Sequence, residues 1–291
     1  MSIITKVSLK LLDLVSPYIL SDELVIRIRY RILMHKKLCL DDPKTYNEKL
    51  QWIKLYDRRP IYTTLVDKYA VKEYVASKIG KEFIIPTYGI WDSFDSIDFD
   101  SLPDSFVLKC THDSGSYCLC PDKSCFDFTK AKKRLDKALR RNYYSVSREW
   151  PYKNVPPRII AEMYMKDEHT PVLNDYKFFC FDGTVKYLFI ATGRGSDTRF
   201  DFFDDEFHHL DLKHGHKNAD TLIEKPSQFG LMKRIASKLS EGLPQVRVDL
   251  YEINGRVFFG EYTFFHWGGT IPFDPESWDA VFGESIKLPM K

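Results

Sequence analysis

Residues 243–269, LPQVRVDLYEINGRVFFGEYTFFHWGG, hold two apolar runs on either side of a turn. From Val246 to Leu250 every second residue is aliphatic, and this period of two is typical of a half-buried strand. The second run, Val257 to Phe265, is rich in aromatic residues. Between them, Asn254-Gly255 is a strong signal for a tight hairpin turn. The stretch therefore predicts two antiparallel strands joined as a β-hairpin.

Two carboxylates, Asp249 and Glu261, lie within these runs, and the register of the hairpin decides whether they meet. A two-residue loop pairs Ile253 with Arg256 and leaves the two carboxylates on opposite faces. A three-residue loop that includes Ile253 shifts the pairing by one residue. In that register Asp249 and Glu261 become diagonal neighbours on one face, about 7–8 Å apart at the backbone.

A carboxylate among aromatic residues is costly unless it is paired or bound to a cation. On one face, Asp249 and Glu261 can share a hard divalent cation, because Mg²⁺ prefers oxygen ligands. Arg247 would lie beside them, opposite Glu261 in the three-residue-loop register. We therefore predict a magnesium site on this hairpin. An ion-pair cluster of the same three residues, without a metal, is the alternative that the spacing also allows.

Composition narrows the class of protein. The chain has 291 residues, of which 44% are hydrophobic and 29% charged, as in globular enzymes. A net charge of +2 gives no nucleic-acid footprint. We find no apolar run long enough to span a bilayer and no signal peptide, and the six cysteines show no disulfide framework. We expect a cytoplasmic protein.

Residues 1–58 are predicted to form a helical N-terminal region, because their apolar residues recur at helical spacing. Cationic side chains outnumber acidic ones there, which allows peripheral contact with an anionic membrane surface or an acidic polymer. A merely solvated face is the alternative. A further helix is expected over Leu65–Val75, where Lys68 and Lys72, four residues apart, would leave the same helix face.

A strand that carries Lys109 is followed by a small polar loop, Thr111–Ser116. Loops of this kind present backbone N–H groups to phosphate, and a nearby lysine adds a point charge. A plain hairpin turn is the alternative. Downstream, Pro157–Met165 is predicted to be a strand that ends in Glu162 and a short apolar connection. We also predict a hairpin from Asp175 to Ile190 that turns at Asp182-Gly183.

Taken in order, these parts resemble the ATP-grasp superfamily, and most closely its teichuronopeptide-biosynthesis (TupA-like) branch. The resemblance implies an α+β ATP-grasp fold, in which two α+β subdomains clasp ATP, after a short helical N-terminal region. The first subdomain, with a phosphate lid, would cover about 59–161, and the large subdomain, with the metal site, about 162–291. The matching segments are Thr45–Arg58, Leu65–Val75, Phe106–Gly115, Arg148–Tyr164, Asp175–Gly183 and Val246–Thr263.

The resemblance also implies roles in binding ATP. Lysines would hold the phosphates under the lid loop, Glu162 would accept from the adenine amino group, and Asp175 would bind the ribose. The backbone from Met163 to Met165 would line the adenine pocket. The residues implied to bind ATP are Lys68, Lys109, Thr111, His112, Ser114, Gly115, Glu162, Met163, Met165, Asp175 and Lys177.

Magnesium would be held by Asp249, Glu261 and Thr263, the last standing where superfamily members often have an asparagine. A hydroxyl is a poorer magnesium ligand than an amide oxygen, so Thr263 is expected to act through water. Arg247 and Lys109 would be catalytic and stabilise the transferred phosphate. We expect Asp249→Asn or Glu261→Gln to abolish turnover with little loss of folding.

The implied function is ATP-dependent ligation of a carboxylate to an amine through an acyl phosphate. By analogy with the branch, the carboxylate would be a uronic acid of a surface polysaccharide or its precursor, or an acidic amino acid, and the amine an amino acid or amino alcohol. Contact with polysaccharide assembly machinery would follow. Two alternatives stay open: a metal-dependent glycosyltransferase that uses Asp98-Phe99-Asp100, and a nucleotide-binding scaffold without catalysis.

Overall fold

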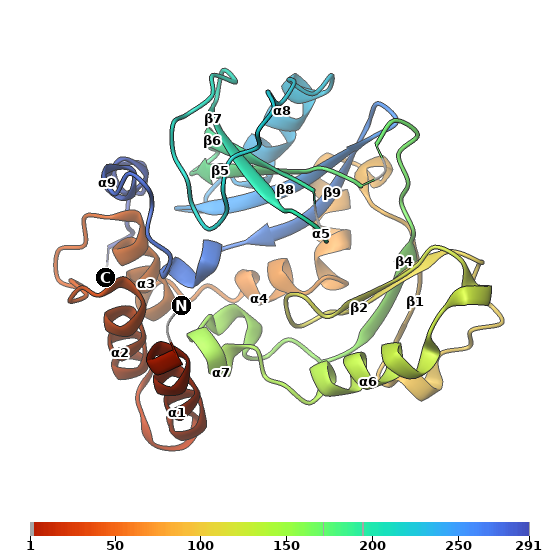
Figure 1. Cartoon of the computed structure of the whole chain (residues 1–291), viewed down its shortest axis with the longest axis horizontal. Coiled ribbons are helices and arrows are strands. Elements are labelled where there is room, and N and C mark those ends of the chain that lie inside the picture. Colours follow the sequence, from red (N-terminus) through yellow and green to blue (C-terminus); the bar gives the residue numbers. More distant parts are fainter. Residues whose placement is uncertain (1–2, 171, 194, 291) are drawn as a thin grey trace.

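The protein is described by a computed structural model that covers residues 3–170, 172–193 and 195–290. Two lobes face each other, each built on an antiparallel sheet, and a group of helices lies at one end (Figure 1). The arrangement is α+β, as predicted. Within the described residues, no helix is both long and apolar enough to cross a membrane.

The N-terminal region is helical, as expected, and it packs against the other end of the chain. α3 begins in a capping box, in which the Thr45 hydroxyl accepts from Glu48 N and the Glu48 carboxylate accepts from Thr45 N. α3 then contacts α9 and the 3₁₀ turn His266–Gly269. The helices concerned are α1 (Ile3–Ile19), α2 (Asp22–Met34), α3 (Tyr46–Tyr56) and α9 (Ser277–Glu284).

The smaller lobe is a four-stranded sheet in the order β1-β4-β2-β3. One face packs on α6 through Phe106 and Leu108, so Lys109 and Glu162, which alternate with the packed residues, point away from α6. Its elements are β1 (Thr87–Trp91), β2 (Phe106–Cys110), β3 (Tyr117–Cys120), α6 (Phe128–Leu139), α7 (Tyr144–Ser147) and β4 (Ile159–Met163).

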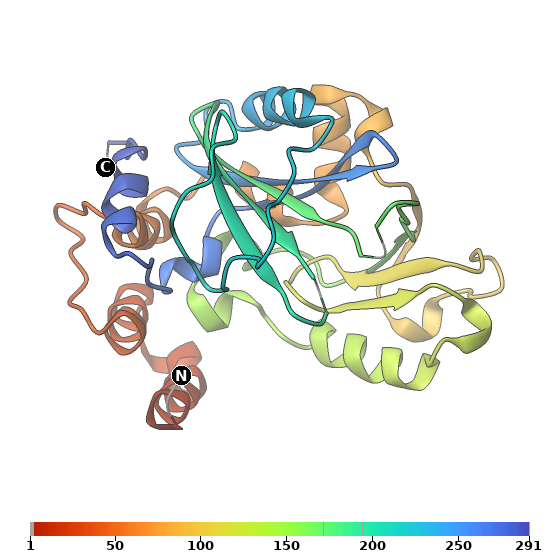
Figure 2. The same cartoon turned by 45° about the horizontal axis from the view of Figure 1, so that its top comes forward.

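The larger lobe is a five-stranded sheet in the order β7-β6-β5-β8-β9, and α8 covers one face (Figure 2). Phe178 packs against Phe229 of α8, so its neighbour Lys177 points to the opposite face, part of which packs on α3 and α9 through Phe179. The turn at Asp182-Gly183 lies where the sequence predicted it. The elements are β5 (Asp175–Phe181), β6 (Thr184–Thr192), β7 (Arg199–Asp204), α8 (Phe229–Leu239), β8 (Val246–Ile253) and β9 (Arg256–Thr263).

Two short helices link the lobes. α4 (Ile61–Val66) contacts β9, and α5 (Ala70–Ile79) packs beside α8. α4 also contacts the 3₁₀ turn Trp150–Tyr152. The predicted subdomain bounds, about 59–161 and about 162–291, stay a prediction.

The predicted three-residue loop of the β8–β9 hairpin is wrong. Ile253 pairs with Arg256, and both loop residues, Asn254 (φ 49°) and Gly255 (φ 72°), are left-handed, as in a two-residue turn. A β-bulge restores the pairing, because Asp249 lies opposite Glu261. The two carboxylates therefore share one face, as predicted, but by another route.

The bulge places glycine where a side chain has little room. Leu250 pairs with Phe259 and Asp249 with Glu261, which leaves Gly260 as the extra residue. A Cβ added to Gly260 would lie 3.0 Å from the Asp249 carbonyl oxygen, closer than ordinary contact. The bulge also moves Arg247 opposite Thr263, not opposite Glu261 as we predicted.

Candidate active site

Asp249 is the centre of a charged cluster on the face of the large sheet opposite α8. It is buried, and its carboxylate accepts from two cations. Arg247 donates from Nε to Oδ1 (2.6 Å) and from Nη2 to Oδ2 (2.7 Å), and Lys177 Nζ also donates to Oδ2. Lys177 is opposite Asp249 in the β5–β8 pairing, and Asp175 Oδ1 lies 3.6 Å from its Nζ. We call Asp175, Lys177, Arg247, Asp249 and Glu261 the floor cluster.

Arg247 is fixed by several partners besides Asp249. Its Nη2 donates to Thr263 Oγ1 (2.9 Å) and lies 3.9 Å from Glu261 Oε1. Burial lowers the pKa of Arg247, but the Asp249 carboxylate outweighs burial and raises it overall. The guanidinium is therefore a permanent, oriented positive charge.

His266 is a residue at this site to which the sequence prediction gave no role. Arg247 Nη1 lies 2.5 Å from His266 Nδ1, and because a guanidinium can only donate, Nδ1 accepts and carries no proton. Burial, together with the charge of Arg247, holds the pKa of His266 well below its ordinary value. A neutral imidazole thus orients the guanidinium. The only signal in the sequence is a histidine inside an aromatic run.

The floor cluster suits a magnesium ion that is shared with phosphate. Within the described residues, no group of three His, Cys, Asp or Glu side chains is placed to hold a metal. Asp249 and Glu261 are directly opposite, however, and Glu261 is half-exposed with Arg247 no closer than 3.9 Å. Mg²⁺ is usually bound by one or two carboxylates, water and substrate phosphates, so two carboxylates fit. The Thr263 hydroxyl already accepts from Arg247, which agrees with an indirect role.

The smaller sheet contributes a second charged cluster. Glu162 is buried, with Lys72 Nζ 2.6 Å from Oε1 and Lys109 Nζ against Oε2. Burial raises the pKa of the Glu162 carboxyl, but the two ammonium groups outweigh burial and hold it below its ordinary value. We call Glu162, Lys72 and Lys109 the roof cluster. The predicted contact from Glu162 to adenine stays a prediction.

The predicted helix over Leu65–Val75 is wrong in one respect. The chain breaks between α4 and α5, where Asp67 Oδ1 accepts from Tyr69 N (2.8 Å), so Lys68 and Lys72 do not share a helix face. Lys68 Nζ donates to the carbonyl of Asp113 in the lid loop. Lys72 Nζ instead donates to Ile85 O (2.6 Å) and pairs with Glu162.

The predicted lid loop is the turn between β2 and β3, and only part of it is open. Thr111 Oγ1 donates to Pro156 O (2.9 Å), and His112 Nε2 lies 3.1 Å from Ala138 O, so both side chains are buried as anchors. Ser114 and Gly115, by contrast, are exposed. Phosphate contact from this loop is therefore expected at its tip.

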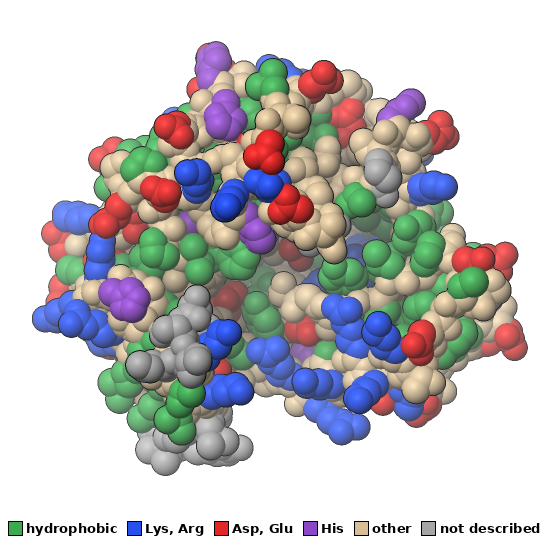
Figure 3. All heavy atoms as spheres, in the orientation of Figure 1, with side chains coloured by type: hydrophobic (Ala, Val, Ile, Leu, Met, Phe, Trp, Pro, Cys, Tyr) green, Lys and Arg blue, Asp and Glu red, His purple; other side chains and the backbone are tan. Residues whose placement is uncertain are grey.

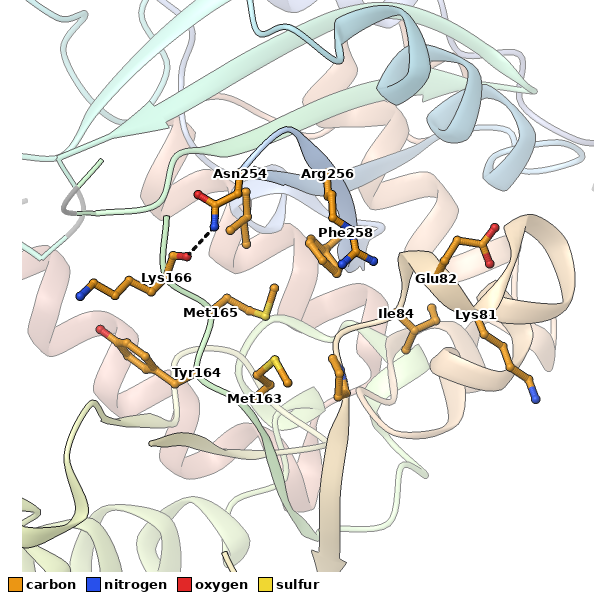
Figure 4. A pocket seen from close by; sticks show the side chains of 12 residues that line it. Lys81, Glu82, Ile84, Met163, Tyr164, Met165, Lys166, Asn254, Arg256 and Phe258 are labelled. Carbon is orange, nitrogen blue, oxygen red and sulfur yellow. Dashed lines mark hydrogen bonds between the residues drawn. The ribbon is translucent and has the colours of Figure 1, made fainter. Parts of the chain in front are cut away.

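The chain passes from the smaller to the larger sheet after β4, and beside this segment lies a cavity of about 520 Å³. Met163 and Met165 line it from one side, and Ile253 and Phe258 from the hairpin (Figure 4). Ile253 shares a face of β8 with Asp249, four residues and about 13 Å away. The cavity thus continues the face of the floor cluster towards the segment that follows β4, where the resemblance implied adenine.

α8 and α6 lie on the outer sides of the two sheets, so the faces that carry the two clusters are turned towards the other lobe (Figure 1). Figure 3 shows a hollow between the lobes, with Lys and Arg side chains gathered over the β2–β3 hairpin and α6. Asp98 and Asp100 do not belong to this site. They are exposed, and Phe99 between them packs on the α6 side of the small sheet, behind Lys109.

The family model for TupA-like ATP-grasp proteins matches residues 48–287. The chain belongs to this family. The match confirms the predicted ATP-grasp superfamily, its TupA-like branch and the ATP-grasp fold. A search of curated proteins returned no match.

Solved structures with similar chains include ATP-grasp ligases. D-alanine–D-alanine ligase from Helicobacter pylori is 14% identical, with 84% of this chain and 69% of that chain covered and a TM-score of 0.42. The Bacillus anthracis D-alanine–D-alanine ligase complexed with ATP is 15% identical, with 76% of this chain and 58% of that chain covered and a TM-score of 0.40. The ligase PsnB complexed with minimal precursor, Mg and ADP is 8% identical, with 75% of this chain and 57% of that chain covered and a TM-score of 0.40. The protein thus spans under two thirds of the last two chains.

Proposed function

We propose that the protein is an ATP-dependent carboxylate–amine ligase that joins a uronic acid of a surface polysaccharide, or of its precursor, to an amino acid or amino alcohol. The ligase proposal is supported by one observation, the charge balance of the two clusters. The floor cluster has more carboxylates than cations, and the roof cluster has more cations than carboxylates. Such a pair of surfaces suits a triphosphate that shares a metal ion with the floor. The uronic acid rests on the resemblance to the TupA-like branch alone.

In the first step a carboxylate oxygen of the acceptor attacks the γ-phosphorus, the bond to the β–γ bridging oxygen breaks, and ADP leaves. Lys109 and Lys177 exchange their carboxylate partners for phosphate oxygens, which compensates the ammonium groups for the lost ion pairs. Arg247, oriented by Asp249, Thr263 and His266, stabilises the charge on the transferred phosphoryl group. Magnesium held by Asp249 and Glu261 would neutralise phosphate charge when bound.

In the second step the amine, after losing a proton to solvent, attacks the acyl carbon. The carbon–oxygen bond to the phosphoryl group breaks, and inorganic phosphate leaves with its electrons. Binding both substrates beside Arg247 converts the encounter into an intramolecular step. The closed cleft protects the acyl phosphate from water.

Trapping the intermediate tests this proposal without knowledge of the natural amine. The protein is incubated with ATP, Mg²⁺, D-glucuronate and hydroxylamine, and both ADP and the hydroxamate are measured. We expect both products to appear together, and neither when D-glucose, which lacks the carboxylate, replaces D-glucuronate. ATP binding without any ADP release, across uronates and acidic amino acids, would contradict the ligase function and favour a scaffold.

A further inference from the structure

The indole of Trp267 lies beside His266, which contacts Arg247 of the floor cluster. Trp267 follows His266, which orients Arg247, and the two rings have centroids 6.0 Å apart. The indole also lies 6.3 Å from Phe200. Phe200 pairs with Ala191, which is itself opposite Asp175, so the indole lies next to the face of the sheet that carries Asp175.

The backbone at Trp267 is held in a conformation that side chains rarely adopt. Its φ is 52° and ψ is 26°, and Gly268 and Gly269 after it are also left-handed. Left-handed residues other than glycine, asparagine and aspartate persist only where their surroundings enforce them, and they cluster at ligand-binding sites.

Two buried side chains of α3 enforce this turn. Gln51 Nε2 donates to the carbonyls of Gly268 (3.0 Å) and Gly269 (2.7 Å), and Lys54 Nζ donates to Gly268 O (2.7 Å). A Cβ on Gly269 would lie 2.4 Å from Gln51 Nε2, so the fit depends on glycine. In Figures 1 and 2 this turn lies between the end of β9 and α7.

The indole is supported on one side and open on another. A Cβ on Gly215 would lie 2.6 Å from the Trp267 Nε1, so the chain at Gly215 packs directly on the ring. Trp267 nevertheless keeps 41% of its surface exposed. The turn therefore presents a flat, supported aromatic surface next to the group that orients Arg247.

We propose that Trp267 is the platform on which the sugar ring of a uronate acceptor stacks. This inference rests on the proposed ligase function. In a uronate the carboxyl carbon is bonded directly to the ring, so a carboxylate that reacts beside Arg247 brings the ring next to it. Aromatic side chains line ligand sites because they offer a large, rigid apolar surface, and the C–H face of a pyranose is the matching surface.

The test observes the indole N–H of Trp267 by ¹⁵N-edited NMR on the whole protein, with D-glucuronate as probe and no ATP. The chain has five tryptophans, and the resonance is assigned by its loss in Trp267→Phe. We expect a saturable shift of this resonance with D-glucuronate and none with L-glutamate, an acid without a ring. Trp267→Gly suits the left-handed backbone, so it removes the indole without new strain.

Binding of D-glucuronate to the variants, measured by calorimetry, supplies the second readout. We expect Trp267→Gly to weaken binding about tenfold, as for the loss of an aromatic contact, while Trp267→Phe retains most of it. Tyr88→Ala removes an equally exposed aromatic side chain on β1 of the other lobe and should leave binding unchanged.

Either of two results contradicts the proposed role of Trp267. In the first, the indole resonance does not shift with D-glucuronate, or shifts equally with L-glutamate. In the second, Trp267→Gly binds D-glucuronate as tightly as the wild type. If that happens while uronate-dependent ADP release persists, the ligase function stands and only the platform fails. A ring-specific indole shift without any ADP release supports the sugar site and removes the ligase function.

Discussion

Asp249 on the floor of the cleft and Glu162 on its roof are both buried carboxylates held between two cations. Their surroundings differ. The partners of Asp249, Lys177 and Arg247, come from the same sheet, and further carboxylates lie nearby. One partner of Glu162, Lys72, comes from α5, which packs against the other lobe.

The difference shows how one cleft can hold both a cation and an anion. The floor cluster has three carboxylates against two cations, and the roof cluster has one carboxylate against two. The floor therefore attracts positive charge and the roof negative charge. The floor contacts lie within one sheet, whereas the roof contact through Lys72 of α5 connects the smaller sheet to a helix that packs on the larger lobe.

The largest effect should come from Asp249→Asn, which removes the negative charge at the centre of the floor cluster. The variant leaves Arg247 and Lys177 buried without their counter-charge, so we expect the free energy of unfolding to fall by about 3–5 kcal/mol, besides loss of turnover. This corrects the sequence-based expectation of little loss of folding. Calorimetric melting measures it, and a melting temperature equal to that of the wild type would mean that the cluster contributes no stability.

Glu261→Gln separates chemistry from folding on the same floor. Glu261 is half-exposed and its nearest cation lies 3.9 Å away, so we expect near-normal melting. Loss of one charge-stabilising group should lower kcat by about 10²–10³. Glu224→Gln, at an exposed site outside the cleft, is the control and should match the wild type. Normal kcat in Glu261→Gln would remove Glu261 from the metal site.

On the roof, Lys109→Met should act on ATP binding. The variant keeps Glu162 paired with Lys72 but removes one cation from the phosphate side, so we expect KM for ATP to rise about tenfold. Lys186→Met, an exposed lysine on β6, removes the same charge elsewhere. An unchanged KM for ATP in Lys109→Met would show that the roof does not bind phosphate.

A dependence of stability on pH is expected from the residues that pack behind the floor cluster. His214 stacks on Phe273 beside His266, and burial lowers the pKa of His214 to about 4. The unfolded chain takes up this proton near pH 6.5, so the stability that neutral His214 contributes is complete above about pH 6.5 and is lost as the pH falls towards about 4.

Melting temperatures measured between about pH 7 and pH 4 test whether stability falls with pH as predicted. The loss over the window is on the order of 3 kcal/mol for a shift of this size. In His214→Phe, the fall in melting temperature at acid pH should become much smaller. In His208→Gln, which changes an exposed histidine paired with Asp204, most of this fall should remain. A fall that is the same in His214→Phe would contradict a buried neutral histidine.

The floor could be predicted from the sequence because strands repeat every two residues. Asp249 and Arg247 are two residues apart, and so are Asp175 and Lys177, which fixes their faces once the strands are recognised. The register could not be predicted, because the bulge at Gly260 offsets the two-residue loop, and bulges depend on tertiary packing.

The roof could be predicted only in part. Lys109 and Glu162 lie on neighbouring strands, but the third member, Lys72, reaches them from α5, across the lobe boundary. No local pattern reports such a contact. His266 was missed for a related reason: its role depends on the position of Arg247, nineteen residues earlier in the chain.

The central claim is that Asp249 and Glu261 together hold the metal of a bound nucleotide. Crystals grown with Mn²⁺ and a non-hydrolysable ATP analogue test it most directly, because manganese is located by its anomalous scattering. We predict a manganese peak bound to both carboxylates and to the phosphates, with Lys177 moved from Asp249 to phosphate. A nucleotide bound with its metal elsewhere, and with the Lys177–Asp249 pair intact, would contradict the account.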